Sequence, residues 1–258
     1  MITDININLS QWPFRRLPLD ETSKLVAKLQ QNGITQAWAG SFDGILHRDI
    51  AGVNARLANE CRLRGEGILI PSGTVNPMLP DWQDDVRRCQ ELHGMRSIRI
   101  NPNYHGYKLD DQVCDELFEH AATHKLIVQL AMKMEDVRTH HPLMMVPTAD
   151  VTPLPDLILR HPEVRVILMN NYGTLRGEAL SKVAQAENVY FDISHAEQVG
   201  ALEKMTRNVP YEKLLFGSHA PFFYLEAALL KFKESEVGET ITRAIQSQNA
   251  ERLLRGSS

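Results

Sequence analysis

The chain has 258 residues, of which 43% are apolar and 23% are charged, a composition that supports a large buried core in a globular protein. The net charge of −4 comes from scattered acidic and basic residues, which excludes a nucleic-acid-binding surface and a polybasic membrane contact. No apolar run approaches the roughly 18–20 residues needed to cross a bilayer, so we expect a soluble protein without a membrane partner.

Eight short segments rich in Val, Ile and Leu alternate with amphipathic segments along the chain. Short apolar runs of this kind are typical of strands that are buried on both faces. The predicted strands are residues 2–8, 34–40, 67–75, 97–101, 126–131, 164–170, 189–194 and 214–218. The predicted helices are residues 20–31, 49–63, 81–93, 110–122, 154–160 and 175–186.

Residues at the helix ends support these assignments. Asp20 and Asp110 stand where helix N-caps belong. Gly33, Gly65 and Gly94 each follow a predicted helix and precede a strand, where a left-handed C-cap would need glycine.

Strict alternation of strands and helices favours a parallel sheet, and eight such units in this length favour closure into a (β/α)8 barrel. The rival is an open, doubly wound sheet. It lacks support because no G-x-G-x-x-G or G-x-x-x-x-G-K-[ST] loop follows any predicted strand. We therefore predict one TIM-barrel domain over residues 1–258, with the first and last strands side by side.

Polar side chains gather at the C-terminal ends of the predicted strands, which is where barrels of this class carry their active sites. We expect the following residues to face this mouth: Asn6, Asn8, Arg99, Asn101, His105, His140, His141, Asn171, His195 and His219. Residues two apart on a strand share a face, so Asn6 and Asn8 can both point inward. A single Asn at a strand end is usually a turn cap, but turn capping does not explain the whole set.

The loop of residues 132–152 is too long for a plain connection between a strand and a helix. We expect it to fold over the mouth and to bring His140 or His141 towards His219 and His105. Pro142 favours an extended backbone at His141, which helps that ring to reach into a cleft. The alternative is a surface loop whose histidines contact only water.

Three cysteines, Cys61, Cys89 and Cys114, lack any C-x-x-C spacing and fall in predicted helices. Buried free thiols are the preferred interpretation, and they suit a reducing compartment. Acidic and amide residues interrupt the N-terminal segment from Asp4 onward, so it does not read as a signal peptide. We therefore expect a cytoplasmic location.

Several of these segments resemble the amidohydrolase superfamily, in particular the amidohydrolase-2 group that includes aminocarboxymuconate-semialdehyde decarboxylase-like proteins. The resemblance rests on WPFRR after the first strand, IRINPNYHGYKLDD, VRVILMNNYG, VYFDISH, LLFGSHAPF and the terminal NAERLL. It covers nearly the whole chain and implies a metal-dependent barrel hydrolase, or a lyase.

The metal ligands that the resemblance implies are replaced in this sequence. The first-strand His-x-His of the family falls on Asn6 and Asn8, and its strand-five histidine falls near Ala131. The strand-six histidine falls on Asn171, and the strand-eight aspartate falls on His219. Neutral amides are poor ligands for zinc. We therefore expect no metal ligands at the inherited positions, and we leave the cofactor unknown.

Two chemical hypotheses follow for the histidines. In the first, His219 transfers protons without a metal, as catalytic acid or base, together with His195, His141 and His105. In the second, His219 and some of the other histidines form a relocated zinc site. No two of them show the i, i+4 spacing of helix-borne ligands, which counts against the second hypothesis.

The remaining polar residues are candidates for substrate binding. Arg99 could hold a carboxylate through its planar fork, or it could form an internal salt bridge to Asp192 or Asp43. Asn6, Asn8, Asn101, His140 and Asn171 would orient a carbonyl or hydroxyl group. The remaining histidines, among them His161, are expected to be surface or capping residues.

Two classes of function stay open. The first is an enzyme acting on a small carboxylated or cyclic substrate, by hydrolysis or by non-oxidative decarboxylation. The second is a non-catalytic barrel that binds a ligand or a partner. Nothing in the sequence decides whether the chain forms a homo-oligomer.

Overall fold

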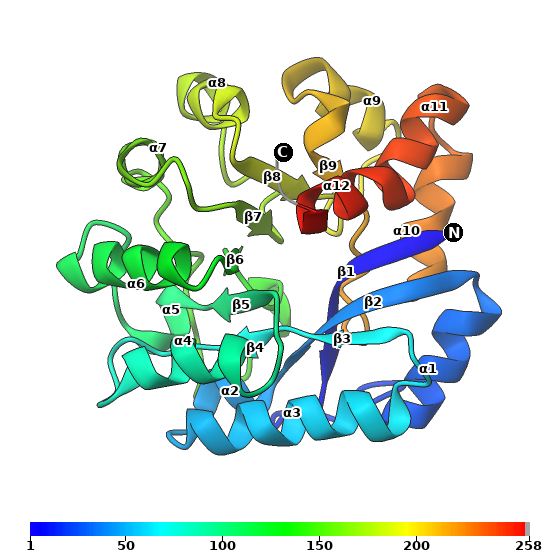
Figure 1. The fold of residues 1–258 in the computed structure, drawn as a ribbon. Coiled ribbons are helices and arrows are strands. Elements are labelled where there is room, and N and C mark those ends of the chain that lie inside the picture. The colour runs from blue at the N-terminus through cyan, green and yellow to red at the C-terminus, as the bar shows by residue number, and fades with distance from the viewer. Residues whose placement is uncertain (256–258) are drawn as a thin grey trace.

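A computed structural model describes residues 1–255 of the chain. Parallel strands form a closed barrel with the helices on the outside (Figure 1), so the predicted (β/α)8 fold is confirmed. The last three residues of the expected 1–258 domain lie outside the described part.

The predicted strands all form, and the third one is divided in two. The strands are β1 (Ile2–Leu9), β2 (Ile34–Ser41), β3 (Leu69–Pro71), β4 (Gly73–Thr74), β5 (Ser97–Ile100), β6 (Ile127–Ala131), β7 (Val166–Met169), β8 (Val189–Asp192) and β9 (Leu214–Leu215). The first helices are α1 (Thr22–Gln31), α2 (Asp43–Leu46), α3 (Ile50–Arg64), α4 (Trp82–Glu91), α5 (Pro102–His105), α6 (Gln112–Thr123) and the short η1 (Val137–Thr139). They are followed by α7 (Leu154–Arg160), α8 (Gly177–Gln185), α9 (Ala201–Asn208), η2 (Tyr211–Lys213), α10 (Leu225–Lys233), α11 (Gly238–Arg243), η3 (Ala244–Gln248) and α12 (Asn249–Arg255).

The ladder runs in chain order around the barrel. β1, β2 and β3 pair in parallel, and β4 to β9 form the second parallel series. The break between them falls after Pro71, which has no N–H to continue the ladder, and the Ser72 N–H still bonds to the Ala39 carbonyl at 2.8 Å. The expected neighbourhood of the first and last strands is confirmed, because the Ile5 N–H donates to the Phe216 carbonyl at 2.9 Å and Ile7 bridges to Ala220.

Three of the expected cap assignments are wrong. The N-caps of α1 and α6 lie one residue later than predicted, at Glu21 and Asp111 instead of Asp20 and Asp110. Gly65 has a φ of −78° and is not left-handed. Glycine is needed at that position because a Cβ there would stand 2.2 Å from the Cys61 carbonyl oxygen.

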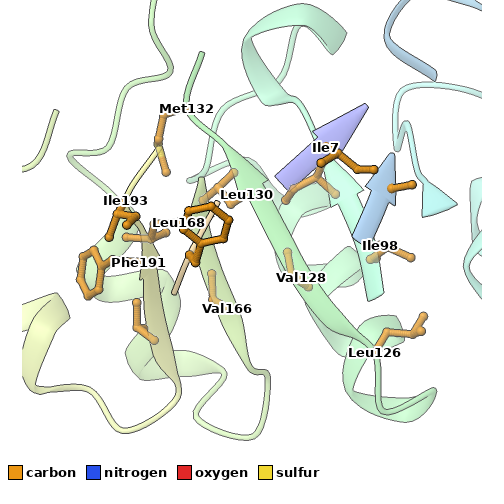
Figure 2. Packing of buried hydrophobic residues seen from close by; sticks show 14 of the residues in the cluster. Ile7, Ile98, Leu126, Val128, Leu130, Met132, Val166, Leu168, Phe191 and Ile193 are labelled. Atoms are coloured by element: carbon orange, nitrogen blue, oxygen red, sulfur yellow. The ribbon is translucent and has the colours of Figure 1, made fainter. Parts of the chain in front are cut away.

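Two apolar layers hold the barrel. On the outside, alternate residues of neighbouring strands pack beneath the helices, as Val128, Leu130, Val166 and Leu168 show in Figure 2. At the N-terminal end, inward residues such as Ile5 and Trp38 pack against Ala250 and Leu253 of α12. Apolar packing therefore closes this end of the barrel and leaves the opposite end for polar groups.

The three cysteines are free and buried, as predicted. Burial raises the pKa of the Cys61, Cys89 and Cys114 thiols to about 12. They are therefore unreactive structural residues at neutral pH.

Candidate functional site

Asn6 is the centre of a buried hydrogen-bond network at the C-terminal end of the barrel. Its Nδ2 donates to Asn170 Oδ1 at 2.8 Å and to Asp192 Oδ2 at 2.6 Å. The Ser194 hydroxyl donates to Asp192 Oδ1 at 2.9 Å, and the Asn170 N–H reaches the same oxygen at 3.1 Å. Burial raises the pKa of Asp192, and these donors oppose the rise because they stabilise the carboxylate.

Arg99 is the centre of a second network beside the first. Its Nη1 donates to Asn8 Oδ1 at 2.7 Å and to the Ile7 carbonyl at 3.2 Å, while Nε and Nη2 both reach Gln129 Oε1 at 3.2 Å. Gly40 makes room for the guanidinium, since a Cβ there would stand 2.5 Å from Arg99 Nη1. The prediction that Asn6, Asn8 and Arg99 point inward is confirmed.

The structure contradicts one of the two sequence hypotheses for Arg99, the internal salt bridge to Asp192 or Asp43, and does not test the binding of a substrate carboxylate. The side chain is 3% exposed, and no carboxylate lies within ion-pair distance of it in the described residues. Asp43 instead lies 4.0 Å from Arg56. Burial lowers the pKa of Arg99 to about 10, while Asp192 and Asp4 raise it from a longer distance. The guanidinium therefore remains a cation at neutral pH, held by neutral amide and carbonyl oxygens.

His219 follows the last strand and is wholly buried. Its backbone is left-handed, with a φ of 59°, and its N–H donates to the Asn6 carbonyl at 2.8 Å. Its Nε2 lies 2.8 Å from the Met134 carbonyl oxygen, which assigns the proton to Nε2. Its Nδ1 is buried and has no partner in the described part of the chain. Burial lowers the pKa of His219 to about 4, so the ring is neutral at pH 7.

His195 lies beside His219 at the end of β8. The two ring centroids are 5.3 Å apart, and His195 Nδ1 is 3.2 Å from the Ser194 hydroxyl. Burial, followed by the neighbouring His219, lowers the pKa of His195 far below its usual value. The structure thus brings together two of the predicted catalytic residues as a pair of neutral imidazoles.

An aromatic layer covers this centre. Trp12 is 3% exposed and makes edge contacts with Phe14, Phe42, Tyr104 and Phe222 at centroid distances of 5.1–6.5 Å. The Phe222 ring also stacks on His219 at 5.1 Å. This layer seals the central residues from solvent. It was not predicted, although the WPF sequence after the first strand was one available signal.

The other predicted histidines lie away from the pair. His105 Nε2 bonds to the Gly44 carbonyl at 3.2 Å, and burial lowers the pKa of His105 to about 4. His141 is exposed and stacks on Phe14 at 5.5 Å, and His140 is half-buried. Among the described residues neither His140 nor His141 has a ring contact or a hydrogen bond to His219 or His105.

The expected role of the 132–152 loop is therefore only partly met. Its first residues reach the mouth, where Met134 accepts the His219 bond and Glu135 pairs with Arg15. Its histidines do not reach the His195–His219 pair, and the exposed His141 stacks on Phe14 instead. Main-chain and apolar groups of the loop cover the centre instead of its imidazoles.

Asn171, Asn101 and His161 have the following positions. Asn171 Nδ2 bonds to the Leu168 carbonyl at 2.6 Å as a local turn contact, and the preceding Asn170 reaches the centre instead. Asn101 is buried, and its Oδ1 has no partner among residues 1–255. His161, expected at the surface or at a helix cap, is the C-cap residue of α7, is 6% exposed and lies 2.8 Å from Asp115 Oδ1.

The chemistry of this set limits what it can bind. In residues 1–255 no three His, Cys, Asp or Glu side chains are grouped as metal ligands would be. Asn8 Oδ1 already accepts a hydrogen bond from the Arg99 cation, and Ala131 packs in one apolar cluster with Trp12.

No helix between residues 1 and 255 is long and apolar enough to span a membrane.

The closed parallel barrel, with polar side chains at the C-terminal strand ends, places the protein in the class of (β/α)8 barrels. The family model described as amidohydrolase matches residues 12–256. The chain therefore belongs to the amidohydrolase family, as the sequence resemblance indicated.

Solved structures support the fold. The chain is similar to 2,6-dihydroxybenzoate decarboxylase from Rhizobium, with 15% identity, a TM-score of 0.73 and coverage of 98% of this chain and 99% of the other. It is also similar to 5-carboxyvanillate decarboxylase LigW from Sphingomonas paucimobilis, with 15% identity, a TM-score of 0.74 and coverage of 92% and 84%.

A third similar structure is a putative amidohydrolase from Staphylococcus aureus, with 12% identity, a TM-score of 0.75 and coverage of 99% and 100%. A comparison with curated proteins found no match.

Proposed function

We propose that this chain is an amidohydrolase-family barrel in which a hydrogen-bonded core replaces the metal centre of the family. We further propose that it binds a small molecule and does not convert it at that centre. The observation that carries this proposal is the Arg99 guanidinium, which is buried and 2.7 Å from Asn8 Oδ1. A metal ion at the inherited position would meet a cation of like charge and amides that are already hydrogen-bonded. The residues present do not fit the metal.

The burial of the polar centre also supports binding without turnover at that centre. A substrate that reached Asn6, Arg99 or His219 would have to displace the Trp12 layer and the Met134 carbonyl. Burying aromatic rings of this size contributes several kcal/mol to folding, so opening the layer is costly.

A second function, metal-independent hydrolysis with His219 as the base, is favoured by one observation. His219 Nδ1 carries a buried lone pair that has no partner in residues 1–255. With a pKa of about 4, His219 is unprotonated at Nδ1 at neutral pH, so it is available there as a weak base and holds no Nδ1 proton to donate. A non-oxidative decarboxylase must deliver a proton to the carbon that loses CO₂. The neutral pair therefore suits hydrolysis of a cyclic ester better than decarboxylation.

The test is a turnover screen with the purified, untagged protein. Lactones and aromatic carboxylic acids are incubated with the protein with EDTA, or with added Zn²⁺ or Mn²⁺, and product formation is followed by NMR. We expect no product under either condition. Product that requires added metal and disappears in Asn8→Ala would overturn the proposal.

The second function has its own signature. Product that forms in EDTA and falls by about 10²-fold or more in His219→Ala would establish His219 as the acid–base group. His124→Ala is the matched control, because His124 caps α6 at the opposite end of the barrel. His161→Ala is unsuitable, since loss of its bond to Asp115 would itself disturb the fold.

A further inference from the structure

A cavity of about 310 Å³ lies outside the aromatic layer, between the ends of β8 and β9 and the helices α9 and α10. Ser194 and Ser218 line it from the strand ends, Leu202 lines it from α9, and Ala228 and Lys231 line it from α10. In (β/α)8 barrels the loops after the seventh and eighth strands often form ligand sites. The volume is at the lower end of the range of about 300–1,000 Å³ found for small-molecule pockets.

Lys231 supplies a cationic group to this cavity. Its Nζ donates to the Ile193 carbonyl at 2.9 Å and to the Ser194 carbonyl. An ammonium group has three N–H donors, so one donor remains after these two bonds. No carboxylate pairs with Lys231 within 4.0 Å in residues 1–255.

The rest of the lining is mostly apolar. Ala196, Ala201, Leu202, Phe223 and Ala228 form much of the wall. Glu197 and Glu234 also line the cavity, but both side chains are largely exposed. Burial lowers the pKa of Lys231 to about 8, and this cost of desolvation falls when an anion accepts from the ammonium.

We propose that this cavity binds a small apolar monocarboxylate. Its carboxylate accepts the free N–H of Lys231, and its apolar body lies against Leu202, Phe223 and Ala228. The inference rests on the proposed function, because it names the ligand class of a barrel that binds without turnover. Phe223 also contacts the His195 ring at 4.9 Å, so an occupied cavity would adjoin the imidazole pair.

Calorimetric titration of the full chain with benzoate and hexanoate tests this site. We expect saturable binding of one equivalent of each acid. Benzamide and hexanamide lack the charge, so their affinity should be lower by at least about tenfold. Lys231→Met should lower the affinity for the acids by about tenfold or more.

Lys213→Met is the matched control. Lys213 Nζ also ties two backbone carbonyls, those of Ala184 and Ala186, at 2.7 and 2.6 Å, and it does not line this cavity. Its loss should leave carboxylate binding unchanged. Ala227→Phe is the second variant, because Ala227 is an exposed lining residue and a phenyl ring there fills the cavity while the Lys231 bonds remain.

The outcomes separate this site from the proposed function. Failure of the acids to bind, equal affinity for acids and amides, or full affinity in Lys231→Met or Ala227→Phe would overturn the site. Conversion of the acid to a product during the titration would overturn binding without turnover and would leave the site standing.

Discussion

Replacing Asn6 with alanine should destabilise the protein strongly. The change removes the bonds from Nδ2 to Asp192 Oδ2 and to Asn170 Oδ1. A hydrogen bond to a charged group contributes about 1.5–3 kcal/mol and a neutral one about 0.5–1.5 kcal/mol, so the free energy of unfolding should fall by about 2–4 kcal/mol. Asp192 would remain buried with one donor fewer.

Urea unfolding, followed by circular dichroism and tryptophan fluorescence, measures this loss. The matched control is Asn101→Ala, since Asn101 is also buried at this end of the barrel and its Oδ1 has no partner among the residues that the structure describes. The control should change the free energy of unfolding by less than about 1 kcal/mol.

An Asn6→Ala variant as stable as the natural sequence, or more stable, would refute this reasoning. Residues that serve a ligand are often kept at a cost to stability, and their removal is then neutral or stabilising. Such a result would assign Asn6 to ligand binding and not to the fold.

Three further predictions concern the same core. Burial raises the pKa of Asp4 from 3.8 to about 6, so folding favours its protonated form. This contribution to the free energy of unfolding is lost as the pH rises from about 4 to 6, by about 3 kcal/mol, and Asp4→Asn should flatten the profile measured by urea unfolding at each pH. Gly40→Ala places a Cβ 2.5 Å from Arg99 Nη1, and thermal unfolding should show a loss of about 1–3 kcal/mol that Arg99→Met partly relieves. Trp12→Ala should cost about 3–5 kcal/mol, and NMR titration should show the His219 pKa rising from about 4 towards its ordinary value of 6.5 as the ring gains solvent.

Each of these predictions has a contrary outcome. An Asp4→Asn variant with an unchanged pH profile would mean that other buried groups, such as Asp192, cause the dependence. Additive effects of Gly40→Ala and Arg99→Met would show that the two positions do not contact each other. A His219 pKa unmoved by Trp12→Ala would show that the aromatic layer does not control access to the centre.

The barrel could be predicted from the sequence because its signals are local and repeated. Short apolar runs such as residues 126–131 and 164–170 define strands whatever surrounds them. The division of the third strand was missed, since it depends on which neighbour supplies a ladder partner at Pro71 and Ser72. Cap positions also moved by one residue, which is within the usual uncertainty of helix ends.

The site was predicted less completely. Strand alternation correctly placed Asn6, Asn8 and Arg99 inside, because side chains two apart share a face. Sequence alone could not decide whether Arg99 faces a substrate or the protein itself, since its partners Asn8 and Gln129 come from distant strands. The same limit hid Lys231, whose role depends on carbonyl groups of residues 193 and 194.

The most direct test of the hydrogen-bonded centre is metal stoichiometry. Untagged protein, grown with zinc and manganese supplements, is analysed by elemental mass spectrometry beside the Asn8→Ala variant. The account predicts well under one equivalent of either metal, with no difference between the two proteins. One equivalent of metal that disappears in Asn8→Ala would contradict it.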